Sequence, residues 1–473
     1  MLYSTRPTAL ELTYSGPGLS NLRDGTAAQV APWYAPTASD IDNLSTIMNA
    51  TGVFGMTFTS SSVQYSDNWC NMPHVRADKY PLVDPSYQLR FVEVIHRHHK
   101  RTPYADNTFP VEHDAWDCSD ERLFYSADRT PFDDQNGSAH TYWAIDSAAT
   151  NPFQAPGFPG NCQFPQITAG GLSDSRQHGR DLASVYIDLI HFLPELYDPT
   201  LVSFRVTTNQ ITSQVASEVI PGLYPALSGS AVPLLVQPPA IDSLEPTYPC
   251  PAATQAYNTL TTSQPWLTHL NLSHSLFAAL DDISGITPAL KEWHTSWDHY
   301  FDNLAARLCH AKPFPCNGTC VTQSQADTVF RLGMWEYSYL YRAAGPATLA
   351  AATSSYGVWA AELAARFRGV STGQVGVRYV HNVAHDGSIA RLLALLQVGR
   401  MIWPGMGAEV VFELYEHAGQ GWFVRVLWGG QTLISNVPEF ERMDLVPLKV
   451  LLGYFDGLVG AGADKVKGLC NAG

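Results

Sequence analysis

Apolar residues recur along this 473-residue chain at spacings that predict strands and helices in alternation. The run "FVEVI" at 91–95 suits a buried strand, and the alternating "LVSFRVTT" at 201–208 suits another. Between them, the apolar residues of 173–195 share one face of a helix. A strand at 375–383 and a helix at 389–398 follow later. Strands that alternate with helices are typical of α/β proteins.

The remaining apolar patterns predict helices in the middle of the chain and strands at its end. A second helix is expected over 209–225, ending at its Pro-Gly pair, and "VPLLVQP" at 232–238 suits a buried strand. Helical spacing dominates 250–370, whereas 408–417 and 422–430 have the composition of strands. The helical block therefore interrupts two regions of alternating strands and helices.

This order predicts a three-layer α/β/α sandwich with a mainly parallel central sheet and a mostly helical cap inserted into it. The expected division is an irregular N-terminal wrap at 1–85, a core formed by 86–235 and 371–473, and a cap at 236–370. In such sheets, sites lie beyond the carboxyl ends of the strands. Charged residues that follow the predicted strands are therefore the candidates for chemistry.

Charge and composition exclude some partners. The chain holds 28 Lys and Arg against 43 Asp and Glu, a formal net charge of −15. Nucleic acid is therefore not an expected partner, because binding to phosphate backbones needs a broad basic surface. No apolar stretch has the about 20 residues that a membrane-spanning helix needs. A small molecule is the expected partner, and the oligomeric state stays open.

Cysteines and glycosylation sequons favour a secreted protein. The eight cysteines are even in number and scattered along the chain, which suits disulfides better than a metal site. Their spacing does not determine which cysteines pair. We expect a secreted glycoprotein whose leader has been removed. The candidate glycosylation sites are Asn43, Asn49, Asn136, Asn271 and Asn317.

The stretch "HRHHKRTPY" gathers positive charge directly after the first predicted strand. Two guanidinium groups, from Arg97 and Arg101, could hold a tetrahedral dianion through paired N–H donors. The neutral imidazole of His98, between them, is a competent nucleophile toward phosphorus. The alternative is a solvated basic loop with structural histidines, and this stretch alone does not decide between them.

Three segments, in order along the chain, resemble the motifs of the histidine acid phosphatases, one branch of the histidine phosphatase superfamily. "RHHKRTP" at 97–103 is similar to R-H-G-x-R-x-P, the signature of that family. "RVTTNQITSQVA" at 205–216 is similar to the segment that carries a third phosphate-binding arginine. "VAHDGS" at 383–388 is similar to the region of the family's His-Asp pair. The resemblance spans roughly 90–450 and implies a phosphatase of the fold predicted above.

The resemblance also implies a role for each matching residue. His98 would attack the phosphoryl group, and Asp386 would protonate the leaving group, so that a phosphate monoester is hydrolysed through a phosphohistidine. No cofactor or metal is expected, because cationic side chains neutralise the phosphate. The expected phosphate-binding residues are Arg97, Arg101, Arg205 and His385.

Two departures from the family pattern keep another function open. His99 stands where the family usually has glycine, and Ile211 replaces the second arginine of the later motif. The first departure places a side chain on a tight turn next to the expected phosphate site. A catalytically inactive glycoprotein of the same fold, used for binding, is therefore an alternative to the enzyme.

A metal-dependent phosphohydrolase of the HD type is a further alternative, because "HNVAHD" at 381–386 fits H-x-x-x-H-D. The strand-like pattern before it argues against this fold, which puts the pair in helices. His96 is expected to point away from the site, since it alternates with Arg97 along the strand. The histidines expected to be structural are His74, His113, His140, His178, His191 and His310.

Overall fold

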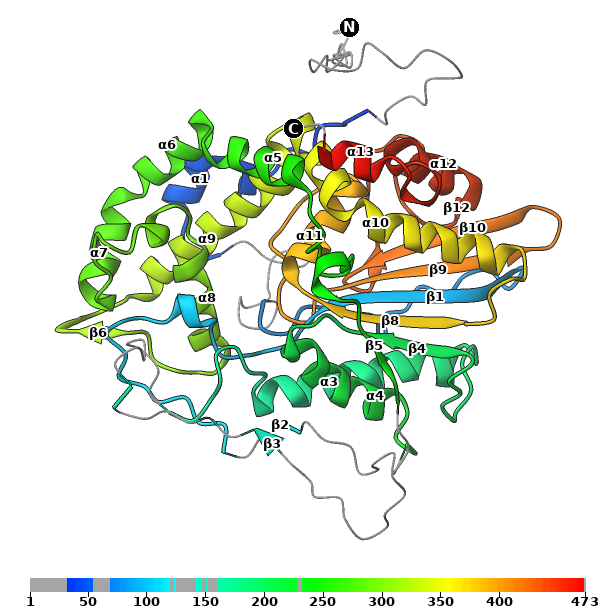
Figure 1. Ribbon diagram of the computed structural model, residues 1–473, viewed down its shortest axis with the longest axis horizontal. Coiled ribbons are helices and arrows are strands. Elements are labelled where there is room, and N and C mark those ends of the chain that lie inside the picture. Colours follow the sequence, from blue (N-terminus) through cyan, green and yellow to red (C-terminus); the bar gives the residue numbers. More distant parts are fainter. Residues whose placement is uncertain are drawn as a thin grey trace, which may run out of the picture.

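The computed structural model describes residues 32–53, 69–119, 160–227 and 232–471, with a few positions between 123 and 151. An eight-stranded sheet forms its centre, in the order β11-β10-β9-β1-β8-β4-β5, with β12 beside β10 (Figure 1). These strands are β1 Tyr87–Arg97, β4 Val202–Arg205, β5 Leu234–Leu235, β8 Tyr379–Ala384, β9 Glu409–His417, β10 Gly421–Trp428, β11 Gln431–Thr432 and β12 Val446–Pro447.

The sheet has a parallel half and an antiparallel half. Strands β1, β8, β4 and β5 run parallel to one another. On the other side of β1, the strands β9 and β10 are antiparallel neighbours. The parallel half is the one whose carboxyl ends can build a site, as the sequence predicts.

Helices cover both faces of the sheet and confirm the three-layer architecture. The helices α3 (Ala169–Ala183) and α4 (Gln210–Leu223) lie on one face, and α10 (Pro346–Ser371), α11 (Asp386–Leu395) and α12 (Leu448–Val459) on the other (Figure 1). Strand β1 serves both layers, because successive side chains point to opposite faces. Its Val92 and Val94 belong to the core under α3 and α4, and Phe91 and Ile95 to the core under α10.

A second group of helices lies beyond the carboxyl ends of the parallel strands (Figure 1). It comprises α5 Pro251–Thr261, α6 Gln264–Leu272, α7 His274–Ser284, α8 Asp298–Cys309 and α9 Gln323–Ser338, with α1 Leu44–Asn49 packed on α9. Where this cap begins and ends stays a prediction. The short elements are η1 Asp40–Asp42, η2 Ala105–Asn107, η3 Ser184–Leu189, η4 Pro239–Ile241, η5 Lys291–His294, η6 Tyr339–Ala343, η7 Ala461–Ala463, β2 Leu123–Phe124, β3 Tyr142–Trp143, β6 Cys316–Asn317, β7 Thr319–Cys320 and α13 Val466–Asn471.

The Pro-Gly pair does not end the second helix, which corrects the sequence prediction. Helix α4 continues through Pro221 to Leu223. Gly222 is needed there because α3 and α4 cross in close contact. A β-carbon on Gly222 would lie 2.3 Å from the Arg176 carbonyl oxygen, and one on Gly179 would lie 2.2 Å from that of Val219.

The expected buried strand at 232–238 is also wrong in length and burial. Only Leu234–Leu235 pair with the sheet, as its edge strand β5. Leu235 and Val236 are 54% and 52% exposed. An apolar run alone does not distinguish an edge strand from a central one, because burial depends on the neighbours that tertiary packing supplies.

The cysteines are all paired, as expected from their number. The disulfides join Cys70 to Cys309, Cys118 to Cys162, Cys250 to Cys470 and Cys316 to Cys320. Within the described residues, no helix has the length and apolar character needed to cross a bilayer. Asn136 lies outside the described residues, and the other four sequon asparagines are exposed, so their glycosylation stays a prediction.

Candidate active site

The register of the parallel strands brings three predicted motifs to one edge of the sheet. Arg97 at the end of β1 pairs with Ala384 of β8, and Arg205 at the end of β4 pairs with Asn382. The residues that follow these strands therefore emerge side by side. His98 and His385 are in contact, with ring centroids 5.6 Å apart.

The hydrogen bond of His98 determines which of its ring nitrogens carries the lone pair. Its side chain is buried, and its Nδ1–H donates to the backbone oxygen of His99 at 3.0 Å. This bond leaves the lone pair on Nε2. Burial and the nearby cations of Arg101 and Arg97 hold the pKa of His98 well below its usual value. The imidazole is therefore neutral, with an unprotonated Nε2.

Two buried arginines flank this imidazole. Arg97 donates from Nη1 to the Pro404 carbonyl at 2.6 Å, and its Nη2 lies 3.1 Å from Asp386. Arg101 forms an ion pair with Asp302 at 2.9 Å. The Nε–H of each arginine is buried without a partner in the described part of the chain. Each guanidinium thus has donor capacity left for an anion.

Asp386 begins helix α11 and is held at three points. Its Oδ1 accepts from the Gly387 N–H, and its Oδ2 from the Trp403 indole N–H, both at 2.8 Å. Burial raises the pKa of Asp386, but Arg97, the Trp403 N–H and other donors outweigh that effect, so the pKa ends below its usual value. Trp403 itself stacks between Phe301 and Tyr337, with ring centroids at 3.9 and 4.1 Å. An aromatic wall therefore stands beside the acid.

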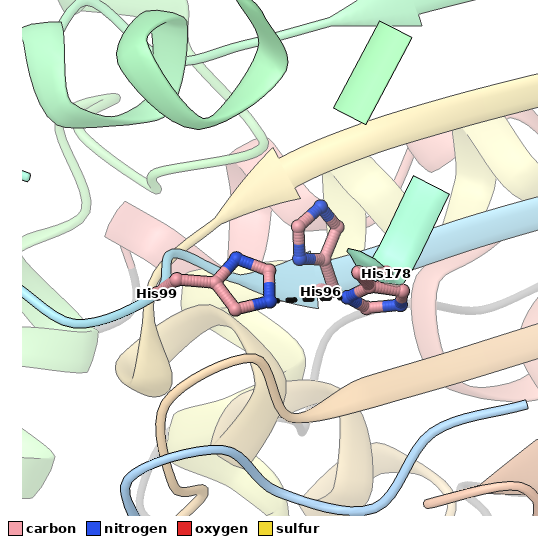
Figure 2. Close-up of side chains that lie close together, drawn as sticks. All are labelled: His96, His99 and His178. Carbon is pink, nitrogen blue, oxygen red and sulfur yellow. Dashed lines mark hydrogen bonds between the residues drawn. The ribbon is translucent and has the colours of Figure 1, made fainter. Parts of the chain in front are cut away.

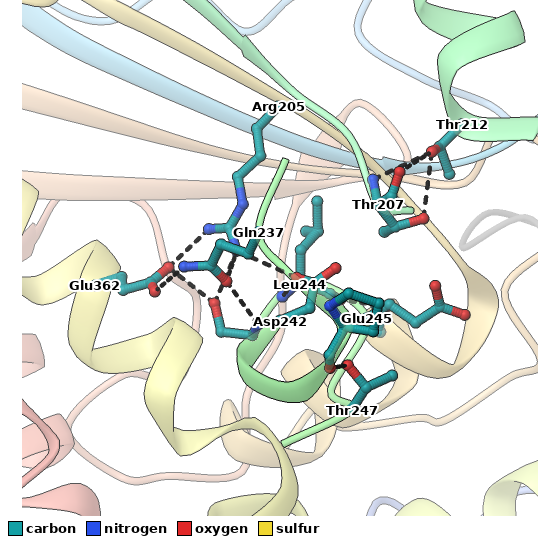
Figure 3. A network of polar contacts seen from close by, with 12 residues as sticks. Arg205, Thr207, Thr212, Gln237, Asp242, Leu244, Glu245, Thr247 and Glu362 are labelled. Carbon is teal, nitrogen blue, oxygen red and sulfur yellow. Dashed lines mark hydrogen bonds and ion pairs between the residues drawn. The ribbon is translucent and has the colours of Figure 1, made fainter. Parts of the chain in front are cut away.

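Arg205 is held by acidic and polar partners, and its expected role in binding phosphate stays a prediction. Figure 3 shows its guanidinium turned toward Gln237 and Glu362. Its hydrogen bonds go to Glu362 at 2.7 Å, Gln237 at 2.6 Å, Ser243 at 2.9 Å and Asp242 at 3.4 Å. Because α10 and the loop at 237–243 supply these acceptors, Arg205 joins that loop to the sheet.

Thr207 and Glu245 contact His385 at the end of the parallel strands. Thr207 Oγ1 lies 3.0 Å, and Glu245 Oε2 lies 3.4 Å, from the Nε2 of His385. Neither residue was predicted, because a loop far along the chain brings Glu245 to the strand end. The only signal in the sequence was that Thr207 lies two residues after Arg205 in the same motif.

The cap adds further carboxylates that the sequence analysis missed. Helix α8 supplies Asp302, the partner of Arg101, and Asp298 at its first turn. The protein atoms around the Asp298 carboxyl and the charges of Asp302 and Asp386 raise its pKa to about 7, although part of the residue reaches solvent. Arg97, Arg101 and His385 therefore each have an acidic neighbour.

The departures from the family pattern lie outside this pocket. The side chain of His99 turns away from His98 and is fully buried against Ser175 and His178. Ile211 is buried in α4. His99 therefore does not narrow the space around the nucleophile.

The HD-type metal site has no support in this geometry. His381 packs against His96, with ring centroids 4.8 Å apart, whereas His385 packs against His98. The two histidines of that motif therefore serve different clusters. His96 faces away from the pocket, as the alternation along the strand predicts.

A neutral imidazole between two buried arginines, facing a His-Asp pair at the edge of a parallel sheet, defines a histidine-type phosphatase site. The chain belongs to branch 2 of the histidine phosphatase superfamily, whose sequence pattern matches residues 88–428.

The similar proteins include phytases, a probable acid phosphatase and a protein named as a counting factor. Counting factor 60 of Dictyostelium discoideum is 25% identical over 362 residues, which cover 74% of this chain and 81% of that protein. A probable acid phosphatase of the same organism is 24% identical over 164 residues, 34% of this chain and 28% of its own. The phytase of Hafnia alvei shares the fold, with a TM-score of 0.54 at 12% identity over 81% of this chain and 99% of its own.

Proposed function

We propose that the protein hydrolyses phosphate monoesters at acidic pH through a phosphohistidine on His98. The observation that carries this proposal is the hydrogen bond from His98 Nδ1 to the His99 carbonyl. It fixes the tautomer whose Nε2 is free to attack, between two arginines with spare donors. A histidine kept only for packing would not need that free nitrogen.

Two steps complete the reaction. In the first, His98 Nε2 bonds to phosphorus while the ester P–O bond breaks, and Asp386 gives its proton to the leaving oxygen. In the second, water attacks the phosphohistidine, the N–P bond breaks, and Asp386 takes the proton of that water. Arg97, Arg101 and His385 hold the phosphoryl oxygens throughout. Arg205 acts at a distance, by holding the loop that carries Glu245.

The acidic neighbours of the pocket favour activity below neutral pH. At neutral pH Asp302 and Glu245 compete with a phosphate dianion for Arg101 and His385, and the charge of the nearby Asp298 repels it. The pKa of Asp298 is about 7, so this repulsion falls as the pH drops below that value. Asp386 must also be protonated to act as an acid, and low pH together with a bound dianion favours that form.

A monoester with one phosphate and an apolar or aromatic leaving group fits this pocket best. The stacked rings of Trp403, Tyr337 and Phe301 border Asp386, where the leaving group must lie. An inositol polyphosphate, which the names of the phytase relatives suggest, would instead bring many negative charges beside these carboxylates.

A binding function without catalysis is the second candidate, and two observations favour it. Arg205 is occupied by acidic partners, and the relative with the broadest sequence match is named as a counting factor. The disulfides support the further proposal that the protein works outside the cytosol, since such bonds persist in oxidising compartments.

Trapping the covalent intermediate tests the enzyme against the binding protein. Wild type and His98→Ala would be mixed with a ³²P-labelled aryl phosphate at pH 5, quenched within milliseconds in alkali, and separated on a denaturing gel. We expect label on the wild type that survives alkali and is lost in acid, as a phosphoramidate bond is, and none on His98→Ala. A wild type that neither takes up label nor releases phosphate would reject catalysis and support the binding protein.

A further inference from the structure

A second group of histidines lies behind the His98 loop, on the side facing α3. It comprises His74, His96, His99, His178 and His381, all of them buried. Figure 2 shows three of these rings, with His99 and His178 facing each other and His96 beside them. One ring nitrogen from each of these three lies within 4.8 Å of the other two. None of these side chains has a part in the reaction proposed above.

Hydrogen bonds hold the outer nitrogens of the facing pair. His178 Nε2 lies 2.8 Å from Glu409 Oε2, at hydrogen-bond distance. The single hydroxyl hydrogen of Ser175 goes to the Gly171 carbonyl at 2.7 Å, so Ser175 Oγ accepts from His99 Nδ1 at 3.1 Å. His99 Nε2 therefore carries a lone pair, and it faces His178 Nδ1 at 3.3 Å across one hydrogen bond. A metal ion between these two nitrogens would displace that proton.

We propose that His99 Nε2 and His178 Nδ1 bind a divalent transition-metal ion of the zinc class, with His96 as the third ligand. Metal–nitrogen bonds of about 2.0–2.1 Å at tetrahedral angles set two ligand nitrogens about 3.3–3.4 Å apart. The observed separation of 3.3 Å meets this requirement. One ring nitrogen of His96 lies within 4.8 Å of both, so binding a common ion would draw this ring closer to the pair.

A buried carboxyl group stands behind the pair. Glu409 is fully buried, and among the described residues it bonds to His178 and to the Val75 N–H. A carboxylate on the outer nitrogen of a ligating histidine is the usual second layer of a zinc site. The surroundings of His178 therefore match those of a metal ligand.

Space next to the pair is kept open by a glycine. Gly407 has φ +71°, and a β-carbon there would lie 2.8 Å from His99 Nε2 and 3.5 Å from Asn71 Oδ1. That amide oxygen is buried and has no partner in the described part of the chain. The metal would thus occupy a space bounded by three imidazoles, one free acceptor and a residue without a side chain.

Metal analysis of the intact protein tests this site. The protein would be produced in zinc-supplemented medium, purified without a metal-affinity tag, and measured by inductively coupled plasma mass spectrometry. We expect about one equivalent of metal in the wild type and more than tenfold less in His99→Gly and His178→Gln. His113→Gln, a change at an exposed histidine outside the cluster, should keep the metal.

Cobalt provides a readout of the ligands themselves. Protein produced with Co²⁺ should show visible d–d absorption of a four-coordinate nitrogen site, and His99→Gly should lose it. The variant restores the residue usual in the family, which makes folding the expectation. A wild type with less than about a tenth of an equivalent of metal and no cobalt spectrum would overturn the proposal, whatever its activity.

Discussion

The two sides of residues 96–99 hold histidines in opposite chemical settings. On one side, His98 is flanked by Arg97 and Arg101, whose cations repel a proton and attract a phosphate. On the other side, His99 contacts His178 and through it the buried carboxylate of Glu409. One short segment thus separates a site for an anion from a proposed site for a cation.

The backbone determines which face of the sheet each side chain reaches, and the residues packed on that face determine what its imidazole can bind. Strand alternation sends His96 to one face and Arg97 to the other. Both histidine environments are buried, so burial alone does not distinguish them. What distinguishes them is the nearest partner: two arginine cations beside His98, and His178 with the carboxyl of Glu409 beside His99.

Removing the proposed nucleophile should have the largest effect on activity and none on the metal content. His98→Ala should lower kcat for p-nitrophenyl phosphate by at least about a thousandfold, because no other group can form the N–P bond. The metal content should stay at the wild-type level, since His98 is not a proposed ligand. His113→Ala, at an exposed position, serves as the matched control and should keep full activity. Full activity in His98→Ala would refute the mechanism.

Removing the acid should give an effect that depends on the leaving group. Asp386→Asn is expected to lower kcat by about 10²–10⁴ for alkyl phosphates, whose alkoxides leave poorly without a proton. The loss should be smaller for p-nitrophenyl phosphate, since p-nitrophenolate leaves readily. A plot of log kcat against the pKa of the leaving alcohol should therefore steepen in the variant. An unchanged slope would remove Asp386 from this role.

Replacing the carboxyl group of Glu409 tests the proposed metal site. Glu409→Gln should weaken metal binding by about 10–100-fold, because the amide orients His178 less strongly. Competition with a coloured chelator would measure the change. Asp181→Asn alters the carboxylate that contacts His74 instead, and it should leave the metal affinity unchanged. Equal losses in both variants would point to general loosening of the cluster.

The smallest expected effect concerns pH. Asp298 is ionised above its pKa of about 7 and then opposes a phosphate dianion. Asp298→Asn removes this charge, so kcat/KM at pH 7.5 should rise about three- to tenfold relative to its value at pH 5. The ratio should be followed across the whole pH profile. A profile identical to that of the wild type would show that Asp298 lies too far from the phosphate to matter.

The sequence predicted what depends on strand order and motif spacing. His98, His385 and Asp386 come together because their motifs follow neighbouring parallel strands. It did not predict the partners of Arg205, because Glu362 and Gln237 come from elements more than 30 residues distant. No periodicity in a single sequence reports such a contact.

The proposed metal site could not be predicted from the sequence either, because its residues are distant along the chain. His99, His178 and Glu409 come from a loop, a helix and a strand, and only the packing of α3 against the sheet makes them neighbours. The sequence did mark His99 as unusual for its family position. It could not say that the side chain would leave the phosphate pocket.

The two longest disulfides have a consequence for proteolysis. One spans 70–309 and the other spans 250–470, so the two covalent loops overlap. A single cut of the backbone anywhere between 70 and 470 therefore leaves both fragments joined. A protease that nicks the chain once would change its mobility on a reducing gel and not on a non-reducing one. The fragments would stay within reach of each other, so one nick need not disperse the residues that build the phosphate pocket.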